Sequence, residues 1–144
     1  MSPIAFVHGK DIDFQLDDSG GTLRTIKVYL DTVSGLPGAR GLSEVTSFGD
    51  AGTKSIPSLQ NVTFQIAGSF DNTATTGVYT VLAGLRAATA TSSFVYGPMG
   101  TTGGNPKFTG ECWLTEFTVD ASVKEKVPIA ATFQVDGAVT LTTY

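Results

Sequence analysis

Glu111 and Glu116 have the side chains most suited to catalysis, because two carboxyl groups can act as acid and base in glycoside hydrolysis. They lie five positions apart in KFTGECWLTEFTV, a segment with the pattern of a β-strand. An odd spacing on a strand directs two side chains to opposite faces, so only a bulge between them would bring the glutamates together. Without a bulge they are two solvated strand residues.

The other candidates for nucleophilic or acid-base chemistry stand alone. His8 is the only histidine and has no acid or nucleophile beside it, which predicts an exposed or loosely packed side chain rather than a base. Cys112 is the only cysteine and alternates in phase with Phe108 and Leu114. That phase predicts a small buried side chain rather than a nucleophile.

Four aspartates near the start of the chain could suggest a calcium loop: Asp11, Asp13, Asp17 and Asp18. The regular ligand spacing, with a following glycine and a distal glutamate, is missing. The sequence also has no P-loop, no GxGxxG before a helix and no GxSxG elbow. We therefore predict no catalytic residue, no metal site, no cofactor and no enzymatic activity.

Length and cysteine content fit one ordinary domain over residues 1–144. A chain of about this size buries roughly 68–70% of its unfolded surface, enough for one core, and a single cysteine excludes an intrachain disulfide. The first residues lack a basic stretch followed by a long apolar one, and no run approaches the roughly 18 apolar residues of a membrane helix. We expect a soluble, unsecreted protein without membrane insertion.

Charged residues are scarce. They make up 15% of the chain, against a usual share of about 25%, so the surface must be rich in Ser, Thr and Gly. Such a surface is typical either of a large interface or of a plain neutral β-protein, and composition alone does not separate the two. The net charge of −4 argues against binding nucleic acid phosphates, which needs clustered Lys and Arg.

Alternating apolar residues predict mostly β-strands, with a DDSGG turn joining the first two. In KFTGECWLTEFTV the inward phase changes from Leu114 to Phe117, which predicts a bulge near residues 114–116. SSFVYGP adds a further short strand. The other predicted inward sets are Ile12, Phe14 and Leu16; Ile26, Val28 and Leu30; Val62, Phe64, Ile66 and Phe70; and Val127, Ile129, Ala131, Phe133 and Val135.

One segment has a helical period instead. In TTGVYTVLAGLRAA the apolar residues recur at i, i+3, i+4 and i+7, which predicts an amphipathic helix over about residues 75–88. Thr75 or Thr76 is placed to cap it, and Gly84 weakens it, so it must rely on packing against the sheet. The apolar positions are Val78, Val81, Leu82 and Leu85.

The glycine-punctuated segment over about residues 33–59 has no long apolar run and is expected to be a long loop between strands. Phe48, Ile56 and Leu59 lie in it, and large apolar side chains would be awkward on the surface of a monomer. We therefore expect the loop to dock on another subunit.

The chain resembles the tail tube proteins, or major tail proteins, of long-tailed bacteriophages. The resemblance lies in VSGLPGARGLSEVTSFGDAGTKSIPSLQNVTFQIAGSFDNTATTGVYTVLAGLRAA, followed by FVYGP and FQVDGAVT. In order, these give a small-residue loop, a TSFGD strand end, a KSIP turn, a GSFD strand end, a short helix and a VDG turn near the end of the chain.

The resemblance implies a mainly β fold, a β-sandwich or distorted barrel of antiparallel strands flanked by one short helix. It implies a structural virion protein that assembles in the host cytoplasm into hexameric rings, which stack into a hollow tail tube conducting DNA to the host without binding it specifically. The implied partners are copies of the same chain, the tape measure protein, and the tail-end or baseplate and terminator proteins.

The resemblance also implies where the subunits touch. The long loop would lie on a neighbouring subunit or ring, and acidic residues on the inner wall would avoid gripping DNA. The expected loop contacts are Leu36, Pro37, Gly38, Arg40, Val45, Phe48, Asp50, Lys54 and Ile56. The candidate acids of the lumen are Asp31, Glu44, Glu111 and Glu116.

Three alternatives stay open. A tube subunit of a contractile injection or secretion device would share the fold and need an outer surface for a sheath. A β-sandwich binding or decoration module would need exposed aromatic side chains, for which Trp113 with Tyr96 is the candidate pair. An enzyme would need a pocket holding a carboxylate with a strongly raised pKa.

Overall fold

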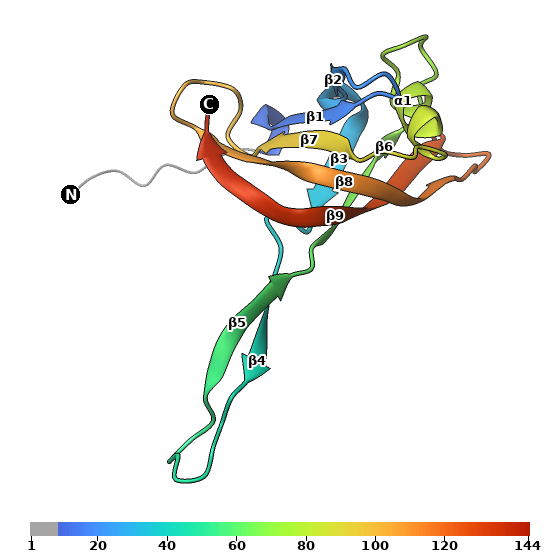
Figure 1. Ribbon diagram of the computed structural model, residues 1–144. Helices are drawn as coiled ribbons and strands as arrows, with labels where there is room; N and C mark the ends of the chain where they lie inside the picture. Colours follow the sequence, from blue (N-terminus) through green and yellow to red (C-terminus); the bar gives the residue numbers. More distant parts are fainter. Residues whose placement is uncertain (1–8) are drawn as a thin grey trace.

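The computed structural model describes residues 9–144, so His8 lies outside the described residues. The chain folds mainly into β-strands with one α-helix and two short 3-10 turns (Figure 1). The elements in chain order are η1 (Gly9–Asp11), β1 (Asp13–Asp17), β2 (Leu23–Thr25), η2 (Lys27–Tyr29), β3 (Leu30–Ser34), β4 (Arg40–Glu44), β5 (Ser55–Gln60), β6 (Thr63–Ser69), α1 (Val78–Leu85), β7 (Ser92–Gly97), β8 (Pro106–Val119) and β9 (Pro128–Thr143).

Seven strands form one antiparallel sheet in the order β2-β1-β7-β8-β9-β6-β3. The sheet curls strongly. Phe64 of β6 contacts Phe94 of β7 with ring centroids 4.8 Å apart, although β8 and β9 lie between these strands in the sheet. The expected mainly antiparallel β fold with one flanking helix is confirmed, and its form is a distorted open barrel with β2 and β3 as its edges.

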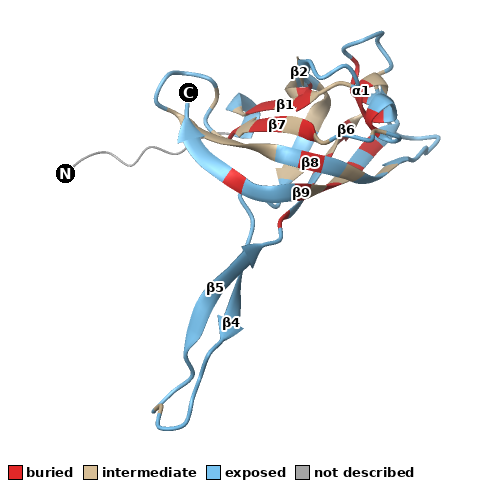
Figure 2. Ribbon diagram, in the orientation of Figure 1, coloured by how far each residue is buried: buried red, intermediate tan, exposed pale blue. Residues whose placement is uncertain are grey.

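Phe64 lies at the centre of the core. Its ring stacks on Phe133 at 4.9 Å and meets Phe14 at 6.1 Å, and all of these rings are fully buried. Figure 2 shows the buried residues gathered on the curled sheet and the helix. The helix contributes the four residues predicted to face the core, which are Val78, Val81, Leu82 and Leu85.

The helix is shorter than predicted at both ends. It begins after Gly77, and no side chain caps it, so the predicted threonine cap is wrong. Thr75 has a φ of 72°, a left-handed conformation incompatible with a helix. A tight turn takes up these residues instead, since Asp71 accepts hydrogen bonds from the amide and hydroxyl of Thr73, and the Gly77 amide donates to the Thr73 carbonyl.

Two strand predictions also need correction. The predicted strand over residues 23–30 is interrupted by η2, so Val28 is 72% exposed while Ile26 is buried. The VDG segment forms no turn, because β9 continues through it. Gly137 has a φ of 86° and forms a bulge there, between the cross-strand pairs Thr109–Thr140 and Glu111–Asp136.

The predicted bulge in β8 is confirmed. The register of β8 on β9 shifts between Leu114, which pairs with Phe133, and Glu116, which pairs with Thr132. The extra residue keeps Leu114 and Phe117 on the inward face. It also places Glu116 on the same outward face as Glu111, although their β9 partners, Asp136 and Thr132, are four residues apart.

Tyr144 fastens the end of β9 to β1. Its hydroxyl donates a 2.7 Å hydrogen bond to Oδ2 of Asp13, a residue only 2% exposed. The ring lies so close to Gly97 that any Cβ there would clash, and the Lys107 ammonium lies 5.2 Å from the ring centroid. The hydroxyl therefore supports a buried carboxylate that has few other donors.

We expect Tyr144→Phe to lower the free energy of unfolding by about 1–3 kcal/mol, because Asp13 loses a donor to its buried carboxylate. Burial, and then the hydrogen bond to Asp13, raise the pKa of Tyr144 above its ordinary value of 10.0. This contribution to stability is therefore full below about pH 10 and is lost as the pH rises further. Urea unfolding of both proteins should show a constant difference from about pH 7 to 9 that shrinks above about pH 10. A difference that does not change with pH would contradict this role.

Candidate assembly surface

The segment between β3 and β6 is a β-hairpin, so the prediction of a loop without strands is wrong. β4 and β5 pair antiparallel, with Leu42 opposite Pro57 and Glu44 opposite Ser55. The hairpin projects far from the curled sheet (Figure 1). We call residues 40–60 the arm. Its strands escape sequence analysis because a proline and a glycine interrupt them and neither carries an apolar alternation.

The turn at the tip of the arm is held by its own contacts. The Ser47 amide donates a 2.7 Å hydrogen bond to Oδ2 of Asp50, and the Lys54 ammonium lies 2.8 Å from Oδ1. Lys54 first, and then Ser47, lower the pKa of Asp50. Asp50 and Lys54, both expected in contact with a neighbour, therefore already pair with each other.

The arm has no core of its own. Among residues 40–60 none is buried, and only Asp50 is half-buried (Figure 2). An isolated two-stranded hairpin is marginally stable at best in water. The two basic and two acidic residues of the arm cancel in formal charge. Its large apolar side chains are 45–109% exposed, and they are Leu42, Val45, Phe48, Ile56 and Leu59.

The root of the arm packs against its own subunit. Leu36 is partly buried against the core. Gly38 has a φ of 95°, and any Cβ there would clash with the Val62 side chain. Leu36 and Gly38 therefore fix the arm to its own subunit. Their contact with a neighbour stays a prediction, as it does for the exposed Pro37, Arg40, Val45, Phe48 and Ile56.

The four candidate lumen acids lie in three places. Glu111 and Glu116 share the outward face of β8, whereas Glu44 is on the arm. Asp31 is on the edge strand β3 and forms a 3.3 Å ion pair with Lys126. Only Glu111 and Glu116 share a face, and they lie apart on it, opposite Asp136 and Thr132 of β9.

A further acid, Asp136, joins this face and was missed by sequence analysis. It lies directly across from Glu111 in the β8–β9 ladder. No signal in the sequence pairs them, because the register depends on the Gly137 bulge. Residues 109–118 of β8, 128–136 of β9 and all of β6 contain no Lys or Arg. We call the outward side of β6 and of these parts of β8 and β9 the acidic face.

Polar contacts order the acidic face. The Ser93 hydroxyl donates a 2.7 Å hydrogen bond to Oε1 of Glu111, and the Thr63 hydroxyl donates a 3.0 Å bond to Oε1 of Gln134. Thr, Gln and Glu side chains thus alternate across the strands. These strand segments present negative charge and neutral polar groups together and supply no Lys or Arg of their own to attract a phosphate. One cation shares a hollow with them, since Arg86, after α1, lies with Thr115 and Glu116.

The described residues considered for catalysis lie apart, with Glu111 and Glu116 on the outward face of β8 and Cys112 on the inward face. Cys112 is fully buried, as predicted, and burial raises the pKa of its thiol to about 12. Within residues 9–144 no group of three His, Cys, Asp or Glu side chains could hold a metal ion. The carboxylates with a shifted pKa all have it lowered, and they are Asp18, Asp50 and Asp71.

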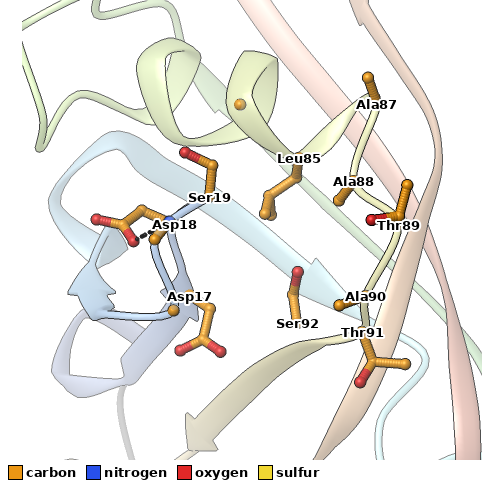
Figure 3. A pocket seen from close by; sticks show the side chains of 13 residues that line it. Asp17, Asp18, Ser19, Leu85, Ala87, Ala88, Thr89, Ala90, Thr91 and Ser92 are labelled. Atoms are coloured by element: carbon orange, nitrogen blue, oxygen red, sulfur yellow. Dashed lines mark hydrogen bonds between the residues drawn. The ribbon is translucent and has the colours of Figure 1, made fainter.

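A shallow cavity of about 510 Å³ lies between the turn after β1 and the end of α1 (Figure 3). Its two acids have structural partners. Asp17 accepts a 2.9 Å hydrogen bond from the Ser93 amide, and Asp18 accepts bonds from the Thr22 amide and the Arg24 side chain. These partners leave the cavity without an unpaired acid.

The aromatic pair proposed for a binding module is not formed. Tyr96 faces inward and packs on Phe14 and Phe108 at ring distances of 6.3 and 5.8 Å. Trp113 faces outward, opposite Gln134. The predicted pair is wrong, because the strand phase places the two rings on opposite sides of the sheet. Among the described helices, none is long and apolar enough to span a membrane.

No protein-family model matches the chain, and no curated protein sequence matches it. Solved structures match it over nearly its whole length. A chain in the tail of an empty gene transfer agent particle, solved with C6 symmetry, is 18% identical with a TM-score of 0.70, and the match covers 94% of this chain and 98% of that one.

Two further structures match with similar coverage. The SPP1 tail tube protein is 10% identical with a TM-score of 0.72, and the match covers 96% of this chain and 80% of that one. A chain in the PVC sheath-tube complex of an extracellular contractile injection system is 13% identical with a TM-score of 0.66, covering 96% and 92%. At sequence identities this low, the similarity shows a shared fold and nothing more. The curled seven-stranded sheet, flanking helix and projecting arm of this chain are thus the tail tube fold.

Proposed function

We propose that this protein is a structural tube subunit, a single domain over residues 1–144 that forms hexameric rings stacked into a hollow phage tail tube conducting DNA to the host. The observation that carries the proposal is the arm, an exposed hairpin with large apolar side chains, no net charge and no core, on a tail tube fold. Such a hairpin is stabilised when another copy covers it.

Ring formation needs a heterologous interface that closes, and stacking needs a second one. The sheet offers two free edges, β2 and β3, that could pair with neighbouring strands. The related tail of the gene transfer agent particle has C6 symmetry, which supports six subunits in a ring. The proposed contacts of the arm are those expected from the sequence, with Leu42 and Leu59 added because both are widely exposed.

We place the acidic face on the inner wall. Glu111, Glu116 and Asp136 would then repel DNA phosphates and let the genome slide without being gripped. Asp31 suits this role less well, because Lys126 neutralises it. Glu44 lies on the arm and is better placed at a contact between subunits.

A tube subunit would also need partners and a place of assembly. The partners would be copies of the chain, a tape measure protein, and terminator and baseplate proteins, in a virion tail assembled in the host cytoplasm. The similar structures include a tube-terminating cap and a baseplate, which supports the last two partners. The protein would need no cofactor and would not be an enzyme. The match to a sheath-tube complex supports a contractile device as the second candidate.

Electron microscopy of the purified protein over a range of concentrations tests the function. We expect hexameric rings or hollow tubes, with light scattering that rises with concentration. Addition of sheath protein from the same source would decorate the tubes only in a contractile device. A protein that stays monomeric at every concentration, even with preformed tube ends added as seeds, would contradict the tube function.

A further inference from the structure

The core has an uncovered apolar end. Phe70 and Tyr79 pack in a tilted arrangement with ring centroids 4.9 Å apart, and Tyr79 meets Phe117 at 6.4 Å. Val119 ends β8 opposite Ile129, and Val127 directly precedes β9 and accepts a hydrogen bond from the Phe70 amide. We call Phe70, Tyr79, Phe117, Val119 and Val127 the ledge. Four of them are 36–41% exposed, and Phe117 is half-buried.

Strand phase explains why the ledge is apolar. Phe117 and Val119 continue the inward face of β8, Val127 continues that of β9 from Ile129, and Phe70 continues that of β6. The Phe70 amide donates a 3.0 Å hydrogen bond to the Val127 carbonyl, so the strands stay paired here. Inward-facing residues thus extend beyond the part of the sheet that the core fills, and water contacts them.

The arm and the ledge lie at opposite ends of β6. The arm joins the sheet before Thr63, and the ledge begins after Ser69, so about seven residues of strand, roughly 23 Å, separate them. The arm also points away from the sheet, while α1 and the loop after β8 lie at the far end of β6 (Figure 1). An arm therefore cannot reach the ledge of its own subunit.

Charge is compatible with contact between the two surfaces. The arm has no formal net charge, and residues 117–127, which carry part of the ledge and its loop, also sum to zero, with two lysines, one aspartate and one glutamate. The excess negative charge of the chain lies chiefly on the acidic face and on β1, with one further acid, Asp71, next to Phe70 and Tyr79. Two copies can bring arm and ledge together without the repulsion that their net charge of −4 each would otherwise cause.

We propose that the ledge is the docking site for the arm of a second copy of this chain. The apolar side chains of the arm cover the uncovered end of the neighbour's core, and the same contact stabilises a hairpin that has no core. The contact is heterologous, because it joins two different surfaces and can repeat from subunit to subunit. It rests on the tube function proposed above and names the surface that receives the arm.

Single substitutions on the ledge test the contact. Val119→Glu and Val127→Glu each place a charge on a side chain about 40% exposed, so both variants should fold, which circular dichroism and melting would check. We expect the fraction of protein in tubes to fall at least tenfold in each. Met99→Glu is the matched control, because Met99 is 42% exposed and lies outside the ledge, the arm and the free edges β2 and β3, and it should assemble like the wild type.

A mixing experiment then identifies the arm as the occupant. Phe48→Glu damages the arm and leaves the ledge intact, whereas Val119→Glu does the reverse. Neither variant alone can form the contact between arm and ledge, so analytical ultracentrifugation should show no tubes for either. Their mixture should form complexes with equal amounts of both, because the intact arm of one fits the intact ledge of the other. A mixture of Phe48→Glu with Leu59→Glu, two arm variants, should form none.

The outcomes separate this contact from the tube function. Wild-type tubes, with folded ledge variants that assemble normally, would overturn the ledge as the receiving surface and leave the tube function standing. Ledge variants that stop assembly but form no mixed complexes would show that the ledge binds something other than the arm. Mixed complexes without any wild-type tubes would overturn the tube function alone. The absence of both would overturn both.

Discussion

Replacing residues 41–59 with a four-residue Gly-Ser linker is expected to abolish tube assembly while leaving the temperature of thermal unfolding almost unchanged. Arg40 and Gln60 are cross-strand partners, so a short linker can join them without strain. No residue that the linker replaces is buried, so the core loses no packing. The apolar side chains of the arm, and with them the contact between subunits, are removed. Electron microscopy measures assembly, and calorimetry measures stability.

A double substitution in another loop provides the control for the arm replacement. Substituting Gly and Ser for Thr101 and Thr102 alters another exposed loop without touching the arm, and this variant should assemble normally. Normal tubes from the armless protein would show that the arm is not needed for assembly. An armless protein that no longer folds would show that the arm stabilises its own subunit.

Phe64→Ala is expected to lower the free energy of unfolding by about 3–5 kcal/mol. Phe64 contacts three other buried phenylalanine rings that come from β1, β7 and β9, so its removal leaves a cavity where the sheet closes on itself. Trp113 is the only tryptophan and lies on the sheet, so its fluorescence can follow unfolding in urea. A loss of this size approaches the whole stability of many domains, and tube yield should fall with it.

The same substitution on an exposed ring is the matched comparison. Phe48→Ala removes a side chain that is fully exposed at the tip of the arm, so the midpoint of urea unfolding should not move. Assembly should weaken, because the arm loses an apolar contact. A loss below about 1 kcal/mol in Phe64→Ala would contradict the closed packing around this ring.

The sequence was most informative where a pattern is tied to burial. Alternation identified the inward faces of β1, β6 and β9, because one side of each strand must be apolar to fill the core. The helical period identified the buried face of α1 for the same reason. The phase change between Leu114 and Phe117 located the β8 bulge, because one extra residue exchanges the faces of everything that follows it.

Prediction failed where no burial constrains the residues. The strands of the arm have solvent on both sides, so no alternation marks them, and their glycines and proline resemble those of a loop. Val28 has the right phase for a strand but lies in a 3-10 turn, where its side chain points into solvent. Asp136 could not be placed beside Glu111, because their pairing depends on a distant register set by the Gly137 bulge.

The arm leaves the sheet just before β6 begins, and the ledge starts just after β6 ends. The two contact surfaces therefore lie at opposite ends of each subunit. A filament in which every arm lies on the next ledge would have unlike tips. Growth would expose unused arms at one tip and unused ledges at the other. A protein that starts such a filament and a protein that stops it must therefore present different surfaces, one shaped like a ledge and the other like an arm.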